Sequence, residues 1–132
     1  MRVHSQQGMS MSPMVALLVP VLLVMVGLVI DGGAQAAGSR RAERVAAAGA
    51  RVGSDAAAAH RLAGQTGAPM AAVSAANRLL ASEPDVFGNA RINGTAVEVH
   101  TTVRTPTVLL SLIGIKSLSA NGYAKADLVA DR

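Results

Sequence analysis

The residue types that most often carry out chemistry are few in this chain and lie far apart. The three histidines are His4, His60 and His100, and no two of them stand at a metal-ligand spacing. There is no cysteine, which excludes thiol chemistry and disulfides. The motifs of phosphate-binding loops and of nucleophilic serines are also absent. The sequence therefore predicts no catalytic residue, no metal site, no cofactor and no small-molecule substrate, and it favours a protein that is not an enzyme.

One short motif is a candidate substrate for another enzyme. Ala34, Gln35 and Ala36 form the small-x-small pattern that signal peptidase cleaves. A secretory signal that ends at Ala36 is therefore one interpretation of the N-terminal region. In that case the mature chain is a secreted, soluble binding domain that begins at Ala37.

The element directly before this motif is an uninterrupted apolar run over residues 13–30, which Asp31 closes. As an α-helix, a run of this length spans about 27 Å, close to the roughly 30 Å hydrocarbon core of a bilayer. Signal peptides have shorter apolar regions of about 7–15 residues, so we favour a retained transmembrane helix over a cleaved signal. Residues 1–12 are then a leader or a cytoplasmic tail.

The charges on the two sides of the apolar run leave its orientation open. Arg2 precedes the run, whereas Arg40, Arg41, Arg44 and Arg51 follow it within about twenty residues. By the positive-inside rule, this count favours the C-terminal part on the cytoplasmic side. Apart from this charge count, both the anchor interpretation and the signal interpretation place the rest of the chain outside the cytoplasm.

Composition limits the size and the partners of the remaining part. After the apolar run there is room for one small domain, and a core of alanine and valine buries little area per residue, so we expect help from partners or from the membrane. The net charge is +4, and Phe87 and Tyr123 are the only aromatic residues. Since no aromatic residues alternate with the basic ones, nucleic-acid binding is not expected. A basic face near anionic lipid headgroups is the better interpretation.

Residues 31–63 are expected to continue the first helix, because alanine is dense there and is the best helix former. Gly27, Gly49 and Gly53 are small residues that would let another helix approach closely, and the last two have the small-xxx-small spacing. An equal alternative to helix packing is that these small residues only reflect the alanine richness of a GC-rich genome.

Residues 68–130 are predicted to form a small α+β domain that begins with a second helix over residues 68–82. A turn at residues 64–67 precedes this helix, and Pro69 fits its first turn. The residue before Pro84 avoids the helical region, which ends the helix. Its expected buried face consists of Met70, Val73, Ala76 or Asn77, and Leu80.

Three antiparallel strands are predicted to complete the domain. Residues 86–92 and 95–104 form a hairpin around Asn93 and Gly94, a pair that favours a type I′ turn. The second arm alternates, with Val97, Val99, Thr101 and Val103 on one side and polar residues on the other. Residues 117–130 alternate in the same way and are expected to pair with the hairpin.

Between the last two strands lies a compact apolar run, residues 108–115, which is too short to span a bilayer. A short buried helix is the favoured interpretation. The alternative is an exposed patch that meets a partner or the membrane surface. The candidate contact residues of that patch are Leu109, Leu110, Leu112, Ile113 and Ile115.

The order of these features resembles a known family. A short leader ends at Gly8, an apolar helix follows and closes with Asp31-Gly32-Gly33, and an Ala/Arg-rich helix comes next. Near the C-terminal end the pattern V-x-V-x-T-x-V-x-T-x-x-x-L-L-x-L-x-G-I-x-S-L-x-A runs over residues 97–120. This arrangement is similar to the TadE/TadG-like pilus-assembly proteins of actinobacteria, over nearly the whole chain.

The resemblance implies a minor, pseudopilin-like or assembly subunit of a Tad/Flp pilus or secretion system. Such proteins are single-pass membrane proteins with the C-terminal domain outside, and their partners are the membrane and other pilin-like or Tad assembly subunits. The family's leader cleavage would fall between Gly8 and Met9. Prepilin-type sequences place glutamate five residues into the mature chain, where this chain has Pro13, so an unprocessed assembly factor is an equal alternative.

Overall fold

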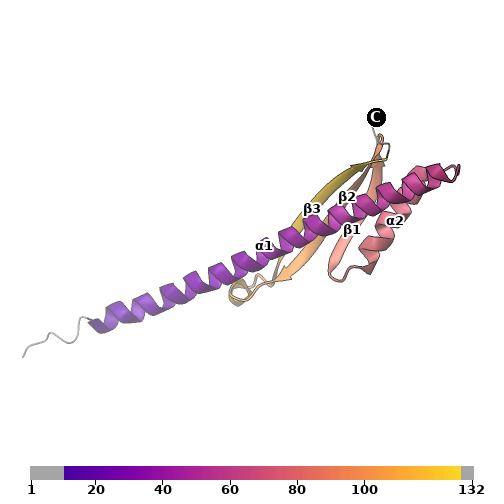
Figure 1. The fold of residues 1–132 in the computed structure, drawn as a ribbon. Helices are drawn as coiled ribbons and strands as arrows, with labels where there is room; N and C mark the ends of the chain where they lie inside the picture. The colour runs from indigo at the N-terminus through magenta and orange to yellow at the C-terminus, as the bar shows by residue number, and fades with distance from the viewer. Residues whose placement is uncertain (1–10, 129–132) are drawn as a thin grey trace, which may run out of the picture.

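The computed structural model describes residues 11–128, which form an α+β fold with two helices followed by a three-stranded antiparallel sheet, as predicted (Figure 1). A short 3-10 helix, η1, lies between the last two strands. The elements in chain order are α1 (Met11–Leu62), α2 (Ala68–Ser82), β1 (Val86–Asn93), β2 (Ala96–Pro106), η1 (Leu110–Ile113) and β3 (Ser117–Asp127).

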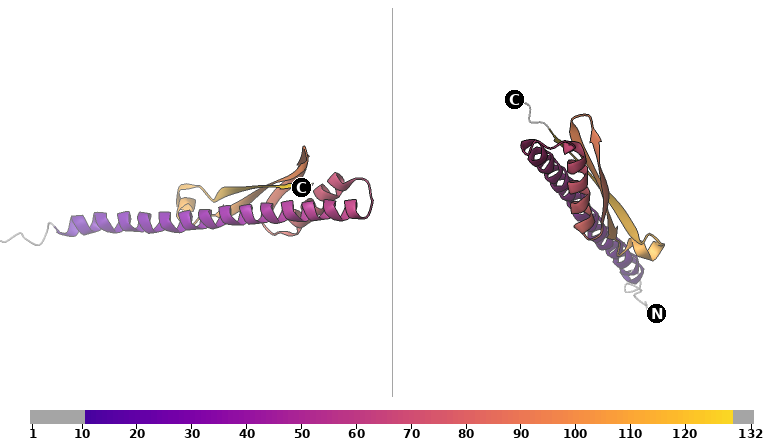
Figure 2. Two further views of the ribbon diagram at one scale, coloured as in Figure 1. Left: turned by 45° about the horizontal axis from the view of Figure 1, so that its top comes forward. Right: turned by 90° about the vertical axis from the view of Figure 1, so that its right-hand side faces the viewer.

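Helix α1 is continuous over 52 residues. At 1.5 Å of rise per residue this is a rod of about 78 Å. The helix passes through Pro20 and through Gly32 and Gly33 without a break, which confirms that it continues beyond the apolar run. Its first part projects beyond the rest of the fold, whereas its second part lies along the sheet (Figures 1 and 2).

Strand β2 is central and pairs antiparallel with β1 and with β3. Asn93 pairs with Ala96, so the hairpin turn consists of Gly94 and Thr95, one residue later than predicted. Gly94 has φ 60°, whereas Asp85 alone among the described non-glycine residues has a positive φ. Glycine at the first central position, followed by a residue with negative φ, is typical of a type II′ turn rather than the predicted type I′ turn.

Both helices cover the same face of the sheet (Figure 2), with α1 against β2 and β3 and α2 against β1. The inward side of β2 is buried, as its alternation predicted. Apart from Leu80 and Leu128, the core consists of alanine and valine. Its members are Ala42, Val45, Ala46, Ala50, Ala57, Ala68, Ala72, Ala76, Leu80, Val86, Ala90, Val97, Val99, Val103 and Leu128.

Small residues bring α1 and the sheet to backbone contact. A Cβ atom on Gly122 of β3 would lie 2.6 Å from the backbone N of Glu43 and would overlap the backbone of Ala42. Beside this contact, the Thr101 hydroxyl donates a hydrogen bond of 2.8 Å to the carbonyl of Ala42. A bulkier side chain at Gly122 would therefore push the helix away from β3.

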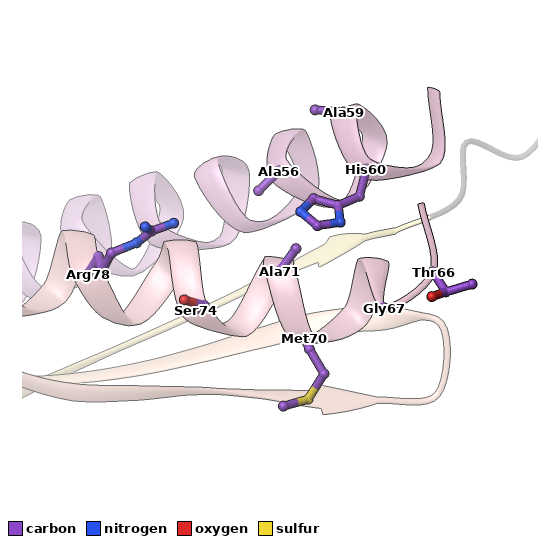
Figure 3. A pocket seen from close by; sticks show the side chains of 9 residues that line it. All are labelled: Ala56, Ala59, His60, Thr66, Gly67, Met70, Ala71, Ser74 and Arg78. Carbon is purple, nitrogen blue, oxygen red and sulfur yellow. The ribbon is translucent and has the colours of Figure 1, made fainter. Parts of the chain in front are cut away.

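The buried face of α2 differs in part from the predicted one. Leu80 and Ala76 are buried and Val73 is partly buried, but Met70 is 74% exposed. The buried side of the first turns consists of alanines, because α2 lies close to α1: a Cβ atom on Gly53 would be only 3.0 Å from the carbonyl oxygen of Ala72. A methionine does not fit such a narrow interface, and Met70 points away from α1 (Figure 3).

Candidate membrane-contact site

The apolar part of α1 is exposed on nearly its whole circumference. The large apolar side chains of residues 14–30 are between 49% and 74% exposed, and Gly27 is the one buried residue in this stretch. Among residues 11–128, α1 is the one helix that is long and apolar enough to cross a membrane. An exposed apolar helix of this length near the N-terminus is typical of a membrane anchor or of a signal sequence.

Asp31 directly follows the apolar part of α1 and contacts the domain. It is 2% exposed, and its carboxylate accepts hydrogen bonds from the backbone amides of Val108 (2.7 Å) and Leu110 (2.8 Å). These hydrogen bonds stabilise the ionised form and hold the pKa of the Asp31 carboxyl below its ordinary value, against the opposing effect of burial. Asp31 thus ties the β2–β3 loop, residues 107–116, to α1.

Two further contacts hold the loop and the start of β3 against α1. The side chain of Leu109 lies on Gly27, so closely that a Cβ atom on Gly27 would overlap it. One turn after Asp31, the Gln35 amide donates a hydrogen bond of 3.1 Å to the carbonyl of Ser119. The loop therefore lies beside the last turn of the apolar run, and Figures 1 and 2 show it as the part of the domain nearest the N-terminal end of α1.

The prediction that residues 108–115 form a buried helix is wrong. The run is an exposed patch, as the alternative interpretation expected, and its contact with a partner or the membrane stays a prediction. Leu112 is 80% exposed, Ile113 73%, Val108 66% and Ile115 43%. The 3-10 helix is only four residues long, and the side chain that lies on Gly27 of α1 is that of Leu109. Of the predicted contact residues, Leu109 and Leu110 are partly buried, whereas Leu112, Ile113 and Ile115 face outward.

The three glycines predicted to pack helices all contact this chain itself. Gly27 contacts Leu109, as described above; a Cβ atom on Gly49 would lie 3.3 Å from Val99, and Gly53 lies against Ala72 of α2. The small residues of α1 recur every three or four positions on the side that faces the sheet and α2. They are Gly38, Ala42, Ala46, Gly49, Gly53 and Ala57. This spacing was visible in the sequence, but spacing does not reveal which element covers the face.

The candidate processing positions lie in two places. Gly8 and Met9 are outside the described residues. Ala34 is partly buried and Ala36 is exposed, and both lie inside α1. Cleavage after Ala36 would separate Gly27, Asp31 and Gln35 from the loop and strand that they contact.

A polar cluster that the sequence did not reveal lies on the outer face of the sheet. Glu98 is 7% exposed and accepts hydrogen bonds from the Asn93 amide (2.8 Å) and the Tyr123 hydroxyl (3.1 Å), and it forms an ion pair with Arg91 (3.4 Å). The hydrogen bond from Asn93 is the main reason that the pKa of Glu98 lies below its ordinary value. Burial and the neighbouring carboxylate raise the pKa of Tyr123. These partners occupy both oxygens of the Glu98 carboxylate and link β1, β2 and β3 on this face of the sheet.

His100 joins this cluster at its edge: its ring lies 4.9 Å from that of Tyr123, and its Nε2 is 3.1 Å from an Arg91 nitrogen. His60 is on α1, far along the chain, and His4 is outside the described residues. Within residues 11–128 there is no group of three His, Cys, Asp or Glu side chains that could hold a metal ion.

A groove of about 660 Å³ is lined by residues from the end of α1, from the turn that follows it and from α2 (Figure 3). His60 and Arg78 are its only ionisable side chains, and they come from different ends of the groove. Alanine, Met70 and glycine make up most of the remaining surface. No pair of groups in it is placed for acid–base or nucleophilic chemistry.

Comparison of the chain with protein-family models, with curated proteins and with solved structures found no match.

Proposed function

We propose that this protein is a non-enzymatic, single-pass membrane subunit of a pilus or secretion assembly, of the TadE/TadG-like type that its sequence resembles. Residues 13–30 lie in the bilayer and the domain lies outside the cytoplasm. The observation that carries the proposal is the form of α1. One unbroken helix exposes apolar side chains over its first part and forms the core of a small domain with its second part.

The contacts around Asp31 favour a retained anchor over a cleaved signal. Gly27, Asp31 and Gln35 each contact the β2–β3 loop or β3, and all three lie before the bond that signal peptidase would cleave. Removal of residues 1–36 would leave two backbone amides of the loop without their carboxylate partner and Leu109 without its neighbour. A signal sequence needs no such contacts with the mature domain.

The second candidate is a secreted binding domain that starts at Ala37. One observation supports it: every core residue that α1 contributes, from Ala42 to Ala57, lies after Ala36. The released chain would thus keep its alanine and valine core and lose only the contacts at the membrane-proximal end.

The intact mass and the N-terminal sequence of the protein from its native host distinguish these candidates. An intact chain in the membrane fraction, starting at Met1, supports an unprocessed assembly factor, and a start at Met9 supports prepilin-type processing. A start at Ala37 in the medium supports the secreted domain and overturns the proposal.

The orientation has its own test, because the chain has no cysteine and a single introduced cysteine is therefore a unique label. Lys125→Cys places a thiol on the outer side of β3. A membrane-impermeant maleimide should label it in intact cells if the domain is outside. Labelling only after cell lysis would contradict the proposed orientation.

A further inference from the structure

We propose that the β2–β3 loop is a second membrane-contact element, which places Leu112 and Ile113 in the interfacial region of the phospholipid bilayer beside α1. This inference rests on the proposed location of residues 13–30 in the bilayer. It adds a lipid-binding surface on the domain itself, so that the protein meets the membrane at two places instead of one.

The first argument is depth. Leu109 packs on Gly27, which lies three residues before Ile30, the end of the apolar run. At 1.5 Å of rise per residue, Gly27 is about 4.5 Å further toward the bilayer centre than Ile30. If residues 13–30 fill the hydrocarbon core, a loop that touches Gly27 lies at the boundary between acyl chains and headgroups. The loop thus reaches lipid through its contact with α1, without any change in its conformation.

The second argument is the surface of the loop. Four apolar side chains point outward from it, and no charged residue occurs between Asp31's partner Val108 and Lys116. Leu112 and Ile113 at its tip are among the most exposed large apolar residues of the described chain. Lys116 follows where the chain turns back, at a place that suits headgroup phosphates. In water such a tip is unfavourable, whereas at the interface its apolar side chains are buried from water and become stabilising.

The third argument is that the loop's backbone polar groups are largely paired. The amides of Val108 and Leu110 donate to Asp31, as described above. Those of Leu112, Gly114 and Ile115 donate to carbonyls within the loop, and the amide of Thr107 donates to the carbonyl of Lys116. The hydroxyls of Ser111 and Thr107 also donate to loop carbonyls. Backbone groups that enter an apolar medium need internal partners, and this loop provides them.

Lipid fits this surface better than a neighbouring subunit because the loop is continuous with the apolar surface of α1. Lipid that surrounds residues 13–30 would reach the tip at the same level. In this arrangement Asp31 acts as a positioning residue: it holds the loop at the bilayer boundary by its two amide hydrogen bonds.

The test uses the full chain in vesicles of phosphatidylethanolamine and phosphatidylglycerol, with one cysteine at a time carrying an environment-sensitive NBD fluorophore. The labelled variants are Leu112→Cys at the loop tip, Val24→Cys in the apolar run, and Leu62→Cys at the far end of α1, where the side chain is 90% exposed. Leu112 is 80% exposed, so the label there does not disturb the core.

We expect the label at position 112 to emit at shorter wavelength than the label at 62, and to be quenched by nitroxides attached near the lipid headgroups. A label at 112 that behaves like the one at 62, while the label at 24 is quenched by nitroxides in the acyl chains, overturns this inference and leaves the proposed anchor intact. If the label at 24 also stays in water, the proposed function fails as well. Protection at 112 that disappears when the protein is diluted in excess lipid assigns the loop to a second copy and also overturns the inference.

Discussion

Gly122 is the position where a single methyl group tests the packing of the fold most directly. It lies on β3 against the backbone of α1, and a Cβ atom there would be 2.6 Å from the backbone N of Glu43. Ordinary van der Waals contacts of a Cβ atom are 3.4–4 Å. Gly122→Ala therefore requires α1 and β3 to separate by roughly 1 Å, and this movement also stretches the hydrogen bond from Thr101 to Ala42.

Overpacking of this kind destabilises a protein by about 1–3 kcal/mol. The loss is large for a small alanine–valine core, since domains as a rule have only about 5–15 kcal/mol of stability. Gly33→Ala is the matched control: Gly33 is in α1, and a Cβ atom there would meet nothing within 4 Å. Because alanine favours helix more than glycine does by about 1 kcal/mol, this variant should be slightly more stable than the native chain.

The assay is denaturant unfolding of the full chain in detergent micelles. Tyr123 is the only tyrosine and there is no tryptophan, so tyrosine fluorescence reports on the sheet alone. We expect a lower midpoint for Gly122→Ala and an equal or higher one for Gly33→Ala. If both variants unfold at the native midpoint, then α1 and β3 are not in backbone contact and the reasoning is refuted.

Three other substitutions test separate contacts. Gly53→Leu should destabilise the domain by about 1–3 kcal/mol, because its side chain would overlap α2; Gly32→Leu, with open space around it, is the control, and equal unfolding midpoints would contradict the packing. Asp31→Ala should speed hydrogen exchange at the amides of Val108 and Leu110, and unchanged protection there would exclude the carboxylate as their acceptor. The lowered pKa of Glu98 implies stability that is present above the ordinary glutamate pKa of about 4.3 and is lost as the pH falls through the lower folded value. Glu98→Gln should therefore flatten acid unfolding in that range, and an unchanged pH profile would assign the acid sensitivity to other groups.

The elements of this fold could be predicted from sequence where the signal is local. Dense alanine predicts the course of α1, Pro84 the end of α2, and the alternation around Val97 and Val99 the buried face of β2. The turn type was wrong because Asn93 and Gly94 are both tolerant of positive φ. Which of them takes the turn depends on the strand register, and pairing of Asn93 with Ala96 fixes that register.

Features of the candidate site depend on which surfaces meet, and local patterns do not contain this information. The run 108–115 is apolar enough to be buried. Asp31 and Gly27, about eighty residues earlier, instead hold Val108, Leu109 and Leu110 beside α1, so that Leu112 and Ile113 face outward. Likewise, Met70 has the correct helical spacing for burial, yet the close approach of two alanine-rich helices leaves no volume for it. A paired search for small residues on α1 and on its partners would be needed to find such contacts.

The continuity of α1 also has a mechanical consequence. The rod that exposes apolar side chains at one end is the same rod around which the domain folds at the other, and no hinge or linker separates the two parts. A force applied to the domain is therefore transmitted along the axis of one helix, through its successive backbone hydrogen bonds. Asp31 and Gln35 also connect α1 to the domain through hydrogen bonds. The position of the domain along the helix axis and its tilt therefore follow those of the apolar segment. A displacement of the apolar segment along the helix axis therefore displaces the domain by the same amount.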